Sequence, residues 1–159
     1  MKDLEPLPLS DKISGAPHPS EATTIFGQDS AQQQFLNAFD RGRLHHAWLL
    51  SGPRGVGKAT LVWKIAKFLL TTPNAPAQDG LFGAMTQHVS NLETPPDHPA
   101  LPRILAGSEP ALCVLRRSYD EKRKRFKQNI TVDDVRSLKS FFGLSAADGG
   151  ARVVIIDAA

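Results

Sequence analysis

The stretch that decides the fold reads Ala47-Trp48-Leu49-Leu50-Ser51-Gly52-Pro53-Arg54-Gly55-Val56-Gly57-Lys58-Ala59-Thr60. Its middle part has the pattern GxxxxGK, in which glycines let backbone N–H groups converge on phosphate oxygens without crowding from side chains. Lys58 supplies a positive charge to the outer phosphates. The next position, where a Ser or Thr would bind magnesium, is Ala59. The stretch predicts a phosphate-binding loop that lacks its metal-binding hydroxyl.

The sequence on either side of this loop has the strand and the helix that the motif requires. Residues 47–50 form a continuous apolar run, as expected of a parallel strand covered on both faces. Apolar residues then recur at helical spacing, and Pro73 lies just past the expected helix end. They are Leu61, Val62, Ile65, Ala66, Phe68 and Leu69. The alternative is a glycine-rich turn that binds nothing.

Length and composition bound the fold and the compartment. A chain of 159 residues that is 41% hydrophobic can bury one core. No stretch approaches the roughly 20 apolar residues of a membrane span, and no signal-peptide pattern is present, so we expect a cytoplasmic protein. The single cysteine, Cys113, excludes an internal disulfide and a zinc site built from several cysteines. Its apolar neighbours favour a small buried side chain over a reactive thiol.

The chain divides into an arm and a domain. Residues 1–23 are rich in proline and lack apolar periodicity, so we expect a flexible N-terminal arm, either disordered or loosely draped. The domain covers residues 24–159, with a helix after Asp29-Ser30 and an irregular proline-rich insertion over about 73–110. Short helices over 84–92 or 101–106 could lie within this insertion.

The remaining part predicts two strands separated by a helix. The strands are residues 112–115 and 152–157, and the helix opens at Thr131-Val132-Asp133-Asp134. Val135, Leu138, Phe141 and Phe142 share one face of this helix. Strands alternating with helices indicate an α/β fold with a parallel sheet and helical crossovers.

Asp157 follows four apolar residues, as does the strand-ending carboxylate that lies beside magnesium in P-loop ATPases. A buried strand that ends at a polar loop gives the same pattern without any such role. The candidate nucleotide site, with no catalytic residue and no metal ligand assigned, is Gly52, Pro53, Arg54, Gly55, Val56, Gly57, Lys58, Ala59, Thr60 and Asp157.

These two sites together resemble the AAA+ ATPases, whose strand-ending Asp is followed by a Glu that orients the attacking water. Here that residue is Ala158. Loss of a positioned general base typically costs ~10² to 10⁴ in rate, so we expect slow hydrolysis or none. Thr60 cannot replace Ala59, because the next residue on a helix points about 100° away. Weak binding of ATP or ADP and an empty pocket both stay open.

Longer stretches resemble one branch of that family, the delta-prime subunits of the bacterial DNA polymerase III clamp loader, over about residues 24–159. The matching stretches are residues 25–28, 44–61, 130–136 and 152–157. The resemblance implies an AAA+-type three-layer P-loop core, here truncated after the third strand, with the lid and collar domains absent. It also implies that the first and third strands lack the strand that would lie between them.

The resemblance implies a noncatalytic subunit of the DNA polymerase III holoenzyme, a DNA-directed DNA polymerase and nucleotidyltransferase as a complex. Its partners would be the gamma/tau and delta subunits and, through the complex, the sliding clamp and primed DNA, with no membrane. A zinc module common in relatives would be metal-free here. The main alternative is an active AAA+ ATPase, either a gamma/tau-type motor or a helicase loader. A small-molecule kinase is disfavoured by Ala59.

The last feature is a basic cluster over residues 116–127, where seven Lys and Arg stand with Asp120 and Glu121. Such a cluster can contact DNA phosphates, or it can be a solvated loop, and the sequence leaves both open. Adjacent histidines in a strand point to opposite faces, so His45 and His46 do not predict a metal site.

Overall fold

The computed structural model describes residues 7–72, 89–143 and 150–157. Its helices are α1 (Asp29–Asp40), α2 (Lys58–Thr71), α3 (Ala100–Leu105) and α4 (Val132–Gly143). Its strands are β1 (Leu112–Leu115), β2 (Tyr119–Asp120), β3 (Arg125–Phe126) and β4 (Val153–Ile156). The fold is mixed α/β, as predicted.

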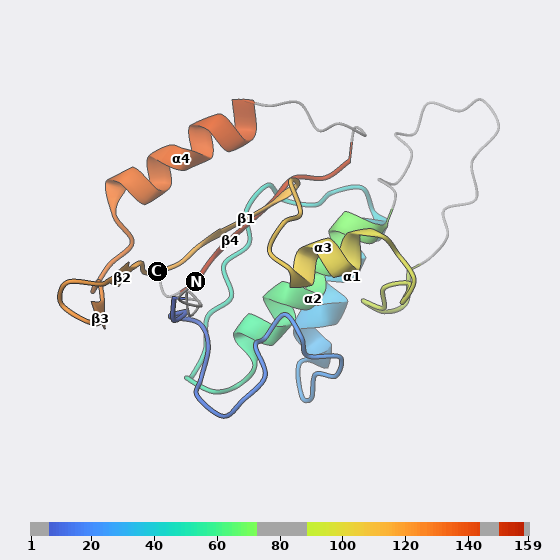
Figure 1. Cartoon of the computed structure of the whole chain (residues 1–159). Helices are drawn as coiled ribbons and strands as arrows, with labels where there is room; N and C mark the ends of the chain where they lie inside the picture. Colours follow the sequence, from blue (N-terminus) through green and yellow to red (C-terminus); the bar gives the residue numbers. More distant parts are fainter. Residues whose placement is uncertain (1–6, 73–88, 144–149, 158–159) are drawn as a thin grey trace.

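The central sheet is formed by β1 and β4, which pair in parallel with Leu112 opposite Val153 and Leu115 opposite Ile156. Figure 1 shows this sheet running between α4 and the pair formed by α2 and α3. Helices on both faces of a parallel sheet give the layered arrangement that α/β sequences predict. The strand predicted over residues 112–115 is therefore confirmed, and the strand predicted over 152–157 is confirmed over 153–156.

Helix α2 lies between two hydrophobic clusters and holds the domain together. Toward α1, its Leu61 and Phe68 pack with Phe35, Leu36 and Leu92. Toward the sheet and α3, Trp63 and Ala66 pack with Ala100, Ile104 and Ile155. Because apolar residues occupy both sides of the helix, α2 is fixed in place, and its first residue, Lys58, is fixed with it.

The strand predicted over residues 47–50 is wrong in this structure. The segment forms no strand, and Leu49 is 93% exposed. Leu50 packs against the cluster around Phe35, and the ring of Trp48 lies 5.4 Å from that of Phe35. A strand needs a neighbour for its backbone N–H and C=O groups. No strand pairs with 47–50 among the described residues, so the segment has no ladder to join.

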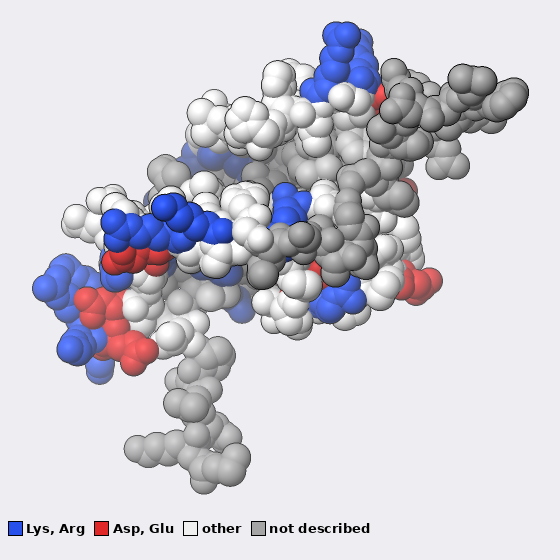
Figure 2. All heavy atoms as spheres, turned by 90° about the horizontal axis from the view of Figure 1, so that it is seen from above, with Lys and Arg blue, Asp and Glu red and all other residues white. Residues whose placement is uncertain are grey.

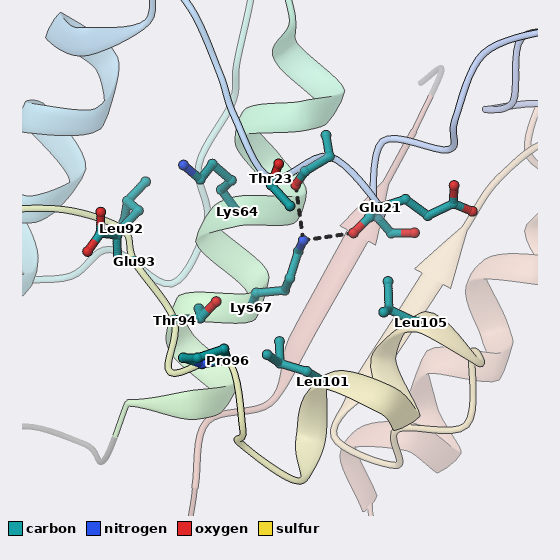
Figure 3. A pocket seen from close by; sticks show the side chains of 12 residues that line it. Glu21, Thr23, Lys64, Lys67, Leu92, Glu93, Thr94, Pro96, Leu101 and Leu105 are labelled. Carbon is teal, nitrogen blue, oxygen red and sulfur yellow. Dashed lines mark hydrogen bonds between the residues drawn. The ribbon is translucent and has the colours of Figure 1, made fainter.

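The N-terminal arm also differs from the flexible segment that its composition predicted, over the part that the structure describes. Asp11 and His18 are buried, and the ring of His18 packs edge-on against Trp63 of α2 at 5.5 Å. Lys67 of α2 donates to the carbonyl oxygens of Ser20 at 2.7 Å and Ala22 at 3.3 Å (Figure 3). Burial, together with the charge of Lys64, lowers the pKa of Lys67.

The described part of the proline-rich insertion contributes to the core. Leu92 is 2% exposed within the first cluster. The helix expected over 101–106 is confirmed as α3, shifted by one residue. The alternative helix over 84–92 falls mostly outside the described residues. The insertion is thus irregular in backbone but packed in part.

Candidate functional site

The candidate phosphate-binding loop has the backbone shape that its glycines predict. Gly52, Gly55 and Gly57 have φ values of 150°, 88° and 90°, in the region that side chains rarely adopt. Residues 51–56 are exposed, and residues 57–60 are half-buried. The loop therefore lies open to solvent and leads directly into the fixed helix α2.

The N-terminus of α2 offers backbone donors to an anion. Gly57 is its N-cap, and the first intrahelical bond runs from Leu61 N–H to the carbonyl of Gly57 at 2.9 Å. No side chain in the described residues caps this helix, and its first turn contains no acidic residue. The N–H groups of Lys58, Ala59 and Thr60 are thus left without intrahelical partners, at the end of the helix that attracts negative charge.

The side chain of Lys58 folds back over the loop. Its Nζ donates to the carbonyl oxygens of Gly52 at 2.9 Å and Pro53 at 2.7 Å. These bonds hold the ammonium group above the turn. A phosphate bound by the loop amides would offer charged acceptors in place of these two neutral ones, and so would add an attraction between opposite charges to the hydrogen bonds of the ammonium group.

Gln28 fixes the loop from the outside, a contact that reasoning from residue types missed. Its Nε2 donates to the carbonyl oxygen of Val56 at 2.7 Å, 28 residues along the chain. The signal was present in the sequence, since Ile25-Phe26-Gly27-Gln28 was among the matching stretches. The bond connects the entry to α1 with the phosphate-binding loop.

The other part of the candidate site is Asp157. It follows β4 directly, is half-buried, and its N–H donates to the carbonyl of Leu115 at 2.9 Å. No hydrogen bond or ion pair joins Asp157 to Lys58 within the described residues. Ala158 lies outside them. The loop leads into α2 and the Asp157 carboxylate follows β4, and these two elements pack against each other.

The pocket between the arm and α2 is separate from the phosphate-binding loop, and the described residues contain no group of metal-ligand side chains. A hollow of about 400 Å³ is lined by residues of the arm, α2, α3 and 92–96, including Lys64 and Lys67, and none of the loop residues 52–58 lines it (Figure 3). Across residues 7–72, 89–143 and 150–157, no three His, Cys, Asp or Glu side chains group as a metal site would require. Burial raises the pKa of the Cys113 thiol, which keeps it protonated.

Comparison with known proteins gives the family. The family model described as "DNA polymerase III, delta subunit" matches residues 27–159, which includes the loop, the sheet and Asp157. The chain belongs to this DNA polymerase III delta-subunit family. The match covers the whole domain expected from residue 24 onward, apart from its first three residues.

Curated relatives of this delta-subunit family member include gamma and tau subunits. DNA polymerase III subunit gamma of Buchnera aphidicola subsp. Schizaphis graminum is 49% identical over 51 residues, which are 32% of this chain and 14% of that protein. DNA polymerase III subunit tau of Escherichia coli K12 is 39% identical over 51 residues, which are 32% of this chain and 8% of that protein. The chain therefore aligns with only a small part of these relatives. No solved structure gives a significant match.

The family match and these relatives thus agree in being DNA polymerase III subunits. None of the helices in the described parts of the chain has the length and apolar character needed to cross a membrane.

Proposed function

We propose that this chain is a noncatalytic, delta-prime-like subunit of the DNA polymerase III clamp loader, which helps to load the sliding clamp onto primed DNA in the cytoplasm. The observation that carries the proposal is the pairing of a family match over residues 27–159 with Ala59 at the metal-binding position of the loop. A loop that keeps its glycines and its lysine but lacks the magnesium hydroxyl serves as architecture. Hydrolysis needs the metal that this position would hold.

Nucleotide binding without hydrolysis is compatible with the loop. Three backbone N–H groups at the start of α2 and the Lys58 ammonium can hold phosphates of ATP or ADP without a tightly bound magnesium ion. Asp157 would then lack the ion beside which its counterparts act. We therefore propose that any bound nucleotide stabilises the subunit and is not consumed.

The partners proposed for the subunit are the gamma/tau and delta subunits, with the sliding clamp and primed DNA reached through the complex. Exposed apolar side chains give the domain surfaces suitable for such contacts. Leu49 is 93% exposed and Ile156 is 53% exposed, while Val132, Val135 and Phe142 are exposed on α4. Single exposed apolar residues are ordinary, but several on one small domain fit a protein that works in an assembly.

One observation favours the second candidate, an active ATPase of the gamma/tau type. The curated relatives are gamma and tau subunits, and the identity reaches 49% over 51 residues. Under this alternative Lys58 and Asp157 would act with a metal site that needs no hydroxyl at position 59.

The two candidates are separated by ATP hydrolysis of the purified chain with magnesium, alone and with its gamma/tau partner. The proposal expects no hydrolysis by the chain alone, and the same rate from the mixture whether the chain carries Lys58 or Lys58→Ala. Lys58-dependent turnover by the chain alone would establish the ATPase instead. Co-purification of the chain with gamma/tau tests the assembly role separately, and failure to co-purify would overturn that role.

A further inference from the structure

The basic cluster that the sequence left undecided contains an ordered hairpin. Strands β2 and β3 pair antiparallel, with Tyr119 opposite Phe126 and Asp120 opposite Arg125. The ladder continues through Lys127 N–H, which donates to the carbonyl of Ser118 at 2.9 Å. A charged segment that forms a ladder is fixed in shape, unlike a solvated loop.

The turn of this hairpin is held by its own acid. Asp120 Oδ1 accepts the N–H groups of Lys122 and Arg123, both at 3.1 Å, and Lys124 adopts a φ of 49°. Side chains of Asp at the start of a turn stabilise it in this way. Asp120 is thereby used to shape the turn. Its Oδ2 lies 3.9 Å from Arg123 Nε, too far for a hydrogen bond.

The positive charges at the tip face solvent. Lys122, Arg123, Lys124, Arg125 and Lys127 are all exposed, against a single acid, Glu121, in residues 121–127. Lys122, Lys124 and Arg125 have no ion-pair partner in the described part of the chain. Figure 2 shows Lys and Arg side chains, with Asp and Glu side chains among them, at the edge of the molecule where Figure 1 places this hairpin.

Arg116, at the N-terminal end of the basic cluster, is already engaged in an ion pair. Arg116 is bound by the buried carboxylate of Asp11 at 2.8 Å and is only 25% exposed, so it holds the arm and does not extend the patch. The patch is therefore limited to the hairpin tip, which we call the basic hairpin (residues 119–127).

We propose that the basic hairpin binds the phosphate backbone of duplex DNA directly. Exposed Lys and Arg without internal partners are what backbone phosphates attract, because their binding releases condensed counterions. Duplex is favoured over single-stranded nucleic acid because the only aromatic rings of the hairpin, Tyr119 and Phe126, pack edge-on against each other at 5.3 Å and are half-buried. Rings engaged in this way do not offer faces for bases to stack on.

This proposal goes beyond the proposed function, in which DNA is reached only through the complex. It predicts contact that positions the chain on DNA without reading sequence, since phosphate contacts carry no base information. Two unrelated duplex sequences should bind equally.

The test is fluorescence anisotropy of a labelled duplex titrated with the full chain between about 50 and 200 mM NaCl. The variant Lys122→Ala/Arg125→Ala removes two exposed charges whose side chains form no ion pair or hydrogen bond within the described part of the chain. It should weaken binding and reduce the steepness of log K against log salt by about 2. The matched control, Arg41→Ala/Arg43→Ala, removes two exposed charges beyond α1 and should leave both values unchanged. Equal losses from both variants would show that only net charge matters, and would overturn the proposal.

Two further arms complete the test. Lys122→Arg/Arg125→Lys keeps the charges and should bind as the unaltered chain does, with all variants showing the same urea midpoint. Tighter binding to single-stranded DNA, to duplex RNA or to vesicles rich in anionic lipid than to duplex DNA would overturn the assignment. Co-purification with gamma/tau should be the same for the hairpin variant, so loss of DNA binding is distinguishable from failure of the assembly role.

Discussion

The Asp11 carboxylate accepts two bonds from Arg116, at 2.8 and 3.1 Å, across 105 residues of chain. The same carboxylate lies 3.1 Å from Nε2 of His18, and only 2% of the Asp11 side chain is exposed. One acid thus ties the arm to the end of β1 and to its own later residues.

Replacing Asp11 with Ala should destabilise the domain by about 1–3 kcal/mol, because removing one partner leaves the other polar groups unsatisfied. Partial exposure of Arg116 keeps the effect below that of a fully buried pair. Urea unfolding measures the loss. Asp29→Ala, in the first turn of α1, serves as the control and should cost less. An Asp11 variant within 0.5 kcal/mol of the parent would contradict this packing.

Lys58 and Ala59 should control how the loop binds nucleotide. Lys58→Ala should reduce ADP affinity by removing the ammonium group that is hydrogen-bonded to Gly52 and Pro53 of the turn, whereas Ala59→Thr should make binding depend on magnesium. Arg43→Ala, which removes an exposed cation beyond α1 and outside the loop, is the control and should leave affinity unchanged. Isothermal titration with and without EDTA measures all three. If the parent chain shows no binding, Ala59→Thr should create magnesium-dependent binding, and a Thr variant insensitive to magnesium would argue against the assigned position.

Neighbouring leucines should respond differently to the same change. Leu49→Ser should alter stability by less than about 0.5 kcal/mol because Leu49 is 93% exposed. Leu50→Ser should cost about 1–3 kcal/mol because Leu50 packs against the cluster around Phe35. The midpoints of urea unfolding of the two variants measure these changes in stability. Equal losses would mean that Leu49 is also buried in solution.

Gly57→Ala should destabilise the domain by about 1–2 kcal/mol, because a residue with a side chain is strained at a φ of 90°. Space is not the cause, since the nearest atom to an added Cβ would be Ile25 Cγ1 at 4.0 Å. The control is Gly143→Ala at the end of α4, where φ is not positive and no atom lies within 4 Å. That change should be neutral or stabilising by thermal unfolding. A Gly57 variant as stable as the parent would show that the loop adopts another shape.

Asp134 caps α4 and should make its stability depend on pH. Its Oδ2 accepts the Thr131 hydroxyl at 2.6 Å and the Thr131 N–H at 2.7 Å, and these bonds lower the pKa of Asp134. A lowered folded-state pKa means stability that is present above the ordinary value and is lost as pH falls through the lowered one. Asp134→Asn should therefore cost about 0.5–2 kcal/mol at pH 7 and nothing in strong acid.

The control for this cap is Asp133→Asn, whose ion pair with Arg136 is fully solvated and should contribute little. Urea unfolding of both variants at pH 7 and at acid pH provides the comparison. A pH-independent difference at Asp134 would refute the cap.

The sequence predicted the elements whose signal is local. Helix α2 follows from apolar spacing after Lys58, and the strands at 112–115 and 153–156 follow from short apolar runs that have a partner in each other. The run at 47–50 is similarly apolar, yet no strand in the described residues pairs with it. Apolar composition reports burial tendency but does not supply a neighbour.

Features that depend on distant contacts could not be predicted. Nothing in the arm's composition indicates that Asp11 meets Arg116, and two-residue strands such as β2 and β3 are too short for an alternating pattern. At the candidate site, the spacing identified the loop and Asp157. The orientation of Lys58 toward two carbonyls is a matter of side-chain geometry that spacing does not encode.

The link between Asp11 and Arg116 also orders events during synthesis. Asp11 leaves the ribosome first, but its partner is added 105 residues later, about 5 to 20 seconds later at ordinary elongation rates. Until then His18 has no folded α2 to lie against and the arm's carboxylate stays solvated. The arm is therefore made before β1 but settles after it, and its docking reports that the strand β1 has already been completed.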